Sequence, residues 1–92
     1  MEHHQLLQLI EAHERAERQL QDSCLAVWAA LMTAEPELAA EILQLFGNED
    51  AAARWASASF RELGSSPARQ AAEGRAATIM STVHKTNHGF VG

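Results

Sequence analysis

The first third of the chain contains no residue that would end a helix. From Glu2 to Met32 there is neither glycine nor proline. One set of residues recurs there in steps of four and three: Leu6, Ile10, His13, Glu17, Leu20, Cys24, Val27 and Leu31. This spacing places them on one stripe of a helix. The pattern predicts a long helix over residues 1–34, and a helix of about 30 residues is long for a small domain.

The predicted stripe is apolar at both ends and polar at its middle, where His13 and Glu17 lie. Two arrangements stay open. The helix breaks near Gln21 to Ser23, or it extends beyond the globule and pairs with a second copy of the chain. In a homodimer through this helix, His13 and Glu17 would set the register, as buried polar residues do in coiled coils. Otherwise they lie at a partly exposed site.

The rest of the chain carries start and stop signals of shorter helices. These signals are Pro36 and Gly47 at the ends of a second helix, Asn48 at the start of a third, and Ser66 and Pro67 at the start of a short fourth. A last helix is predicted from Arg75 to about Thr86, where Ile79, Met80 and Val83 recur at helical spacing. The triplet from Asn87 to Gly89 is typical of a turn. We therefore predict an all-α fold, a single small helical domain over residues 1–92 with about five helices.

Composition and charge limit the classes of function. The 92 residues suffice for one small domain and not for two. Twelve acidic residues against seven basic ones give a net charge of −5, which argues against nucleic acid as a partner. No apolar run approaches the roughly 18 residues that span a bilayer. The single cysteine, Cys24, cannot form an internal disulfide. We expect a cytoplasmic protein that does not bind a membrane.

The sequence lacks a recognisable set of catalytic residues. It has no Ser/His/Asp set, no paired-carboxylate spacing and no Gly-rich phosphate loop. We therefore predict that the protein is not an enzyme and that it needs no cofactor. His84 and His88 are four residues apart, a spacing that can hold a metal ion. Because no third ligand is evident near them, we predict no metal site.

Two tryptophans are the largest candidates for the core. Trp55 recurs with Ala52 and Ala56 at helical spacing and is predicted to fill the core. Trp28 fits either a core or an interface, and the sequence does not choose between them.

The second half of the chain resembles a known family pattern. The residues that carry the resemblance are Leu45-Phe46-Gly47-Asn48, Ala52-Ala53-Arg54-Trp55, Leu63-Gly64-Ser65, Pro67 and His88-Gly89. In this order they are similar to the C-terminal, toxin-binding domain of the Xre/MbcA/ParS antitoxins, and the match covers residues 42–91. The positions that match the structural motif of the family are Phe46, Gly47, Trp55, Leu63, Gly64 and Pro67.

The chain departs from the family pattern in three respects. Ser65 stands where a second glycine is usual, and the segment from Pro67 to Gly74 is shorter than is typical. Family members usually begin with a helix-turn-helix domain that binds DNA. This chain has no room for one before Leu45, and it lacks a basic recognition helix. The resemblance therefore extends to toxin binding and not to DNA binding.

The resemblance implies an inhibitor in a bacterial or phage toxin–antitoxin system, directed at a RES-type toxin that consumes NAD. In the family, the C-terminal end blocks the entrance of the toxin's active site, and the matching positions here are His88, Gly89, Phe90 and Val91. The apolar tail could enter such a cleft or fold back onto its own core. The alternative function is an adaptor of the same fold that binds another protein, such as a transcription regulator or a phage or host defence component.

Overall fold

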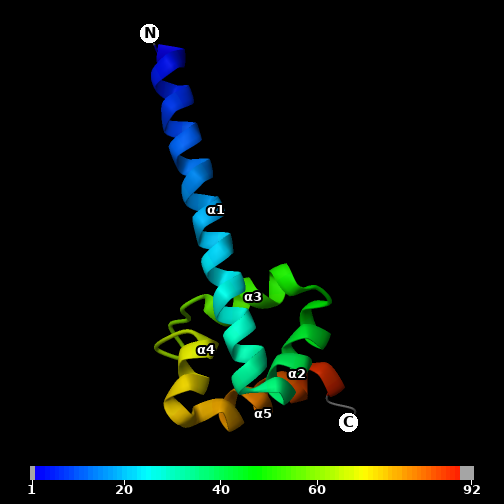
Figure 1. The fold of residues 1–92 in the computed structure, drawn as a ribbon. Helices are drawn as coiled ribbons and strands as arrows, with labels where there is room; N and C mark the ends of the chain where they lie inside the picture. Colours follow the sequence, from blue (N-terminus) through cyan, green and yellow to red (C-terminus); the bar gives the residue numbers. More distant parts are fainter. Residues whose placement is uncertain (1, 90–92) are drawn as a thin grey trace.

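The computed structural model describes residues 2–89, and its regular elements are helices (Figure 1). They are α1 (Glu2–Ala34), α2 (Pro36–Phe46), α3 (Glu49–Ser57), α4 (Pro67–Gln70), the π-helical turn η1 (Ala71–Arg75) and α5 (Ala76–His88). Within this described range the β-type pairing is confined to an isolated bridge between Phe60 and Ser65. The predicted all-α class is confirmed. The number of helices is matched only approximately, because α4, η1 and α5 form one kinked segment.

The first helix is continuous and extends beyond the globule. α1 has 33 residues, which at 1.5 Å per residue makes it about 50 Å long, and it does not break near Gln21. Figure 1 shows its first half projecting away from the helices that follow. The molecule is consequently elongated, with extents of 60 × 29 × 24 Å. Its radius of gyration is 16.5 Å, against about 12 Å for a compact chain of this length.

The core lies between the second half of α1 and the shorter helices. α1 packs mainly against α3, and α2 packs mainly against α5. The buried apolar side chains are Cys24, Trp28, Leu31, Leu38, Ala39, Ile42, Ala52, Ala53, Ala56, Ala71, Ile79 and Val83. Three of them are alanines of α3, and small side chains let two helix axes approach closely. The apolar stripe of α1 therefore enters the core only from Cys24 onward.

Trp28 fills the centre of this core. Its side chain is 1% exposed, and its indole Nε1 has no hydrogen-bond partner among residues 2–89. Trp55 is only partly buried and packs against the outside of the same cluster. The prediction that Trp55 fills the core needs this correction, because α3 turns its alanines toward α1 and leaves Trp55 at the edge.

Local capping sets the ends of the short helices. Gly47 ends α2 in the left-handed conformation, with φ of 80°. Asn48 Oδ1 accepts a backbone N–H of α3 at 2.8 Å, and Ser66 Oγ accepts one of α4 at 3.1 Å. Pro67 occupies the first turn of α4, where its missing N–H leaves no bond unmade. These boundaries agree with the signals in the sequence.

A kink at Gly74 separates α4 from α5. Gly74 has φ of 91° and ψ of 11°, a left-handed conformation that favours glycine. The kink lets α4 pack against α3 while α5 returns across α2.

The last helix is longer than the sequence indicates. Asn87 and His88, which we predicted in a turn, are the final residues of α5, and the helix ends at Gly89 with φ of 70°. Asn87 Nδ2 donates to the backbone oxygen of Glu41 at 2.6 Å and to its Oε2 at 2.8 Å. This attachment to α2 holds the last turn of α5 in helical form.

Candidate functional site

Two of the predicted motif residues, Phe46 and Trp55, belong to an aromatic cluster at the edge of the core. The ring of Trp55 lies between those of Phe46 and Phe60, with centroid distances of 5.5 Å and 6.0 Å. Tilted aromatic pairs at such distances are favourable beyond the area they bury. Phe60 belongs to the loop 58–66, so this cluster attaches the loop to α2 and α3. Phe60 is not one of the motif positions, but its place in the sequence, with Leu63, predicts that it attaches this loop to the core, and the contact with Trp55 agrees with that prediction.

The same loop is closed by its own backbone. Gly64, with φ of 74°, donates its N–H to the carbonyl of Phe60 at 2.9 Å. Leu63 is partly buried against the core, and Pro67 is buried at the start of α4. The motif residues therefore have a structural role here, since they shape the loop and direct the chain into α4.

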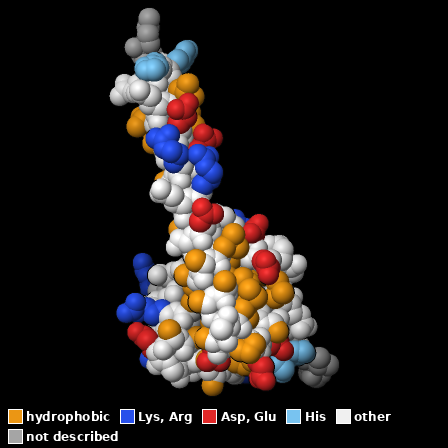
Figure 2. Space-filling model, in the orientation of Figure 1, with side chains coloured by type: hydrophobic (Ala, Val, Ile, Leu, Met, Phe, Trp, Pro, Cys, Tyr) orange, Lys and Arg blue, Asp and Glu red, His pale blue; other side chains and the backbone are white. Residues whose placement is uncertain are grey.

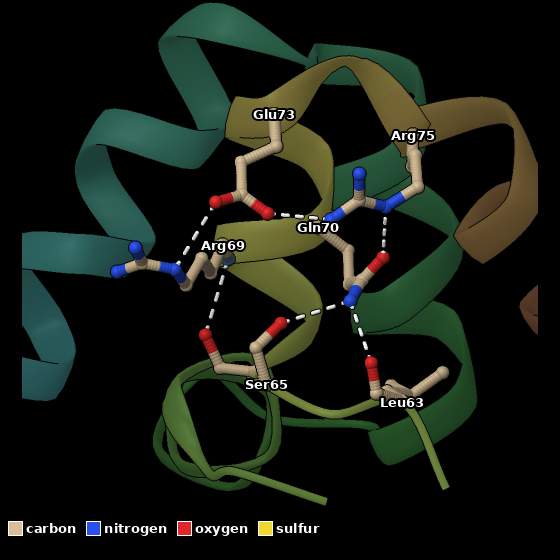
Figure 3. A network of polar contacts seen from close by, with 7 residues as sticks. Leu63, Ser65, Arg69, Gln70, Glu73 and Arg75 are labelled. Atoms are coloured by element: carbon tan, nitrogen blue, oxygen red, sulfur yellow. Dashed lines mark hydrogen bonds and ion pairs between the residues drawn. The ribbon is translucent and has the colours of Figure 1, made fainter.

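A polar network connects the loop to the kinked segment (Figure 3). Gln70 Nε2 donates to the carbonyl of Leu63 at 2.7 Å and to Ser65 Oγ at 2.9 Å. Gln70 Oε1 in turn accepts a hydrogen bond from the guanidinium of Arg75. Ser65 thus contributes its hydroxyl to the network, which a glycine at this position could not do.

The predicted partner-binding residues lie only partly within the described chain. His88 is the last residue of α5 and is about half exposed, and Gly89 is exposed directly after it. Phe90 and Val91 lie outside the described residues. The part of this site that the structure describes therefore consists of the end of α5 and the surface of α2 beside it.

At that place the fold brings Glu41 to His84 and His88, two histidines that are more than 40 positions away from it in the sequence. Glu41 Oε1 of α2 lies 3.7 Å from His84 Nδ1 and 3.4 Å from His88 Nε2. The two imidazole rings are 4.2 Å apart between centroids. The sequence showed the spacing of the two histidines but contained no signal for Glu41, because only the packing of α2 on α5 places it there.

The electrostatics of Glu41 follow from these neighbours. The hydrogen bond from Asn87 is the main cause that holds the pKa of the Glu41 carboxyl below its ordinary value. Desolvation acts in the opposite direction, and the hydrogen bond and charge of His88 and the charge of His84 lower the pKa further. Glu41 is therefore an anionic acceptor that faces both histidines at neutral pH.

The projecting half of α1 is the second candidate surface. Its apolar side chains are exposed, with Leu6 at 54%, Leu7 at 53%, Leu9 at 63%, Ile10 at 43% and Leu20 at 65%. Figure 2 shows hydrophobic side chains along this arm, with charged side chains of both signs among them. His13 and Glu17 form an exposed pair on the arm, with 3.5 Å between Nε2 and Oε1.

The main hollows of the described surface are open. One, of about 470 Å³, lies where the arm meets the globule and is lined by Glu14, Glu17, Arg18, Leu20, Gln21, Cys24 and Arg54. Another, of about 400 Å³, lies between α1 and α4 and is lined mainly by alanines, with Val27, Leu31 and Glu35. No helix of the described chain is long and apolar enough to cross a membrane.

Comparisons with protein families, with curated proteins and with solved structures found no match to this chain.

Proposed function

We propose that this chain is a protein-binding inhibitor of the antitoxin type, without catalytic activity. The observation that carries the protein-binding role is the arm formed by the first half of α1. Its leucines and Ile10 are exposed, and no described part of the chain covers them. A single helix of this length is marginal in water unless its apolar face is packed. An exposed apolar stripe of this kind marks a surface that another protein covers.

The partner that the motif residues favour is a RES-type toxin that consumes NAD. Two features of the fold support this choice. The positive φ angles of Gly47 and Gly64 and the position of Pro67 suit the turns of the antitoxin domain. α5 ends at the surface beside α2, and Gly89, which follows its last residue, leads into the apolar residues Phe90 and Val91.

The tail after Gly89 is the proposed inhibitory element. A phenylalanine that enters a cleft contributes about 1.5–3 kcal/mol of binding free energy when it is fully buried. The net charge of −5 would steer the protein toward a basic pocket that binds the phosphates of NAD. In this proposal His88 and Gly89 contact the rim of the cleft, and Phe90 and Val91 enter it.

The test is inhibition of a purified RES-type enzyme from the same cells by the full chain and by a chain that lacks residues 90–92. We expect the full chain to inhibit NAD consumption and the shortened chain to lose inhibition with an unchanged helical circular dichroism spectrum. The matched control is Gln8→Glu, on the arm and far from the tail, which should inhibit like the original. Equal inhibition by the shortened chain would refute the tail mechanism, and absence of inhibition by the full chain would refute the antitoxin role.

The proposed occupant of the arm is a second copy of this chain in antiparallel orientation. The stripe is symmetric about position 15, so that Ile10 would pack on Leu20 of the other copy and Leu6 near its Cys24. The steps of four and three place these residues alternately at the a and d positions of a heptad repeat. In an antiparallel coiled coil each apolar layer joins an a position of one helix to a d position of the other, as this register does. The hollow of about 470 Å³ beside Leu20 and Cys24 lies where Leu6 of the other copy would arrive.

Charge also favours the antiparallel orientation. In this register His13 of each copy faces Glu17 of the other, whereas a parallel register would place Glu17 opposite Glu17. An imidazole can donate a hydrogen bond to a carboxylate across a helix pair, whereas two carboxylates that face each other repel, so the antiparallel register is the favoured one. The two pairs that lie within the two separate arms, each with its 3.5 Å contact, can therefore be exchanged for two pairs between the arms. A monomer in light scattering at micromolar concentration would contradict the dimer.

The alternative function is an adaptor with a different protein partner. It is favoured by one observation: residues 2–34 form one helix, so no helix-turn-helix precedes the motif in the described chain. Affinity capture from the native cells, followed by mass spectrometry, separates the two functions. A RES-fold enzyme in near-stoichiometric yield supports the antitoxin, and a transcription regulator or defence protein in that yield supports the adaptor.

A further inference from the structure

The cluster of Glu41, His84 and His88 has the composition of a transition-metal site. The three ligand atoms, one carboxylate oxygen and two imidazole nitrogens, all lie within 4.8 Å of one another. Zinc binds such ligands at about 2.0–2.1 Å in tetrahedral geometry, which places ligand atoms about 3.3 Å apart. The observed separations of 3.4 Å and 3.7 Å from Glu41 Oε1 are close to that value. The separation between the two imidazole nitrogens lies within the 4.8 Å that contains all three ligand atoms.

The supporting contacts of Glu41 are those of a metal ligand. Asn87 Nδ2 binds Oε2 at 2.8 Å and thereby leaves Oε1 turned toward both histidines. Hydrogen bonds of this kind orient the ligands of metal sites. The helices behind the cluster are fixed by the core, where Ile42 of α2 and Val83 of α5 are buried. The carboxylate is therefore held in place before any ion binds.

The exposure of the three side chains decides the type of site. The side chain of Glu41 is 21% exposed, while those of His84 and His88 are 59% and 49% exposed. An ion bound there reaches solvent, and its fourth position is open to water or to a group of a partner protein. Two imidazoles and one carboxylate select zinc and its neighbours in the first transition row over magnesium or calcium, which prefer oxygen ligands.

We propose that Glu41, His84 and His88 form a zinc-binding site that joins the last turn of α5 to α2. The ion connects side chains 47 positions apart in the sequence, counted from Glu41 to His88. The ion therefore fixes the end of α5, from which the chain continues beyond Gly89. The site goes beyond the proposed inhibitor function and does not depend on the identity of any partner.

The contact between His13 and Glu17 provides the internal comparison. It also joins an imidazole to a carboxylate four residues away, at 3.5 Å, but both side chains are more than 60% exposed, and no third ligand accompanies them within the described chain. Two ligands on one exposed helix turn bind zinc weakly. His13→Ala is consequently the matched control for a substitution at the proposed site.

The experiment is titration of the full, chelator-treated chain with zinc chloride by isothermal calorimetry, repeated with cobalt(II) for its visible absorption. We expect one ion per chain, a raised melting temperature, and slower amide exchange at residues 84–89. His84→Ala, His88→Ala and Glu41→Gln should each weaken zinc binding at least tenfold, and Asn87→Ala by about tenfold to a hundredfold. His13→Ala should bind zinc like the original chain.

Circular dichroism of each variant shows that a loss of binding is not a loss of fold. Replacing His3 and His4 with alanine removes the remaining histidines and should leave the affinity unchanged. Zinc binding that persists with equal affinity in the double variant His84→Ala/His88→Ala would overturn the site. An original chain that binds zinc no more tightly than this double variant would overturn it as well.

Discussion

At the scale of single residues, the hydrogen bonds of Asn87 decide where α5 ends. Its side chain donates to two oxygens of Glu41, one on the backbone and one on the carboxylate. Asparagine at a helix end usually favours a turn, because its side chain competes for local backbone groups. Here the competing partner belongs to another helix, and the helical turn persists.

The titration of Glu41 should depend on Asn87. The pKa of the Glu41 carboxyl lies below its ordinary value, mainly because of this hydrogen bond. A carboxyl with a lowered folded pKa stabilises the fold above its ordinary pKa, and this contribution is lost as the pH falls through the lowered value. In the metal-free protein, Asn87→Ala should raise the pKa of Glu41 in a carbon-13 NMR titration. Thr86→Ala, one residue earlier, should leave the pKa of Glu41 unchanged. Equal pKa values of Glu41 in the two variants would contradict the conclusion that the Asn87 hydrogen bond lowers it.

The two tryptophans should differ in what they contribute to stability. Trp28→Ala empties the centre of the core and should lower the free energy of unfolding by about 3–5 kcal/mol. Trp55→Ala should cost less, because part of its ring is already exposed. Urea unfolding followed by circular dichroism measures both. If Trp28→Ala does not fold, the milder Trp28→Phe and Trp55→Phe provide the comparison. A decrease in the free energy of unfolding that is as large or larger for Trp55→Phe would contradict the prediction.

At the scale of elements, α1 has two different halves. The half from Cys24 onward is packed against α3 and contributes Trp28 and Leu31 to the core. In the half before it, residues 3–20 are all exposed in the single chain. Both halves have the same helical periodicity, so the division follows from where the other helices pack and not from the helix itself.

The register of the proposed arm pair can be measured by cross-linking. In chains with Cys24→Ala, Ile10→Cys and Leu20→Cys variants are mixed and oxidised. The antiparallel register places position 10 beside position 20 of the other copy, so we expect the mixed disulfide to dominate over disulfides between identical chains. Gln8→Cys mixed with Leu20→Cys is the control, because position 8 lies on the opposite face. Dominant disulfides between identical Ile10→Cys chains would show a parallel pair instead.

At the scale of the whole molecule, a compact domain carries a long arm. The longest dimension of 60 Å is about twice the other two, 29 Å and 24 Å. All of the buried apolar residues lie at Cys24 or later. The domain therefore has the core it needs without the arm.

Removal of residues 1–19 should leave the domain folded. The shortened chain keeps the whole buried core and the contact of Gln21 with Asp50, at 3.0 Å. We expect its thermal midpoint to stay within a few degrees of the original at a concentration where the original is monomeric, and we expect it to be monomeric at any concentration. Leu31→Ala in the full chain is the contrast, since it should cost about 2–5 kcal/mol. Loss of cooperative unfolding in the shortened chain would show that the arm is part of the folding unit.

Local features of the sequence were sufficient to determine the helices and most of their ends. Periodicity determined the long helix, and Gly47, Asn48, Ser66 and Pro67 determined the boundaries of the next three. These signals act within one helical turn, and for that reason they can be recognised without knowledge of the fold.

Only the tertiary structure decided which side chains are buried and which meet. It placed Trp28 at the centre and Trp55 at the edge, kept Asn87 and His88 helical, and exposed the apolar residues of the arm. It also brought Glu41 to His84 and His88, which the sequence alone showed as a pair without a third ligand. The physical reason is that burial and contact depend on how helices pack on one another, and a helical stripe in the sequence does not specify which surface it faces.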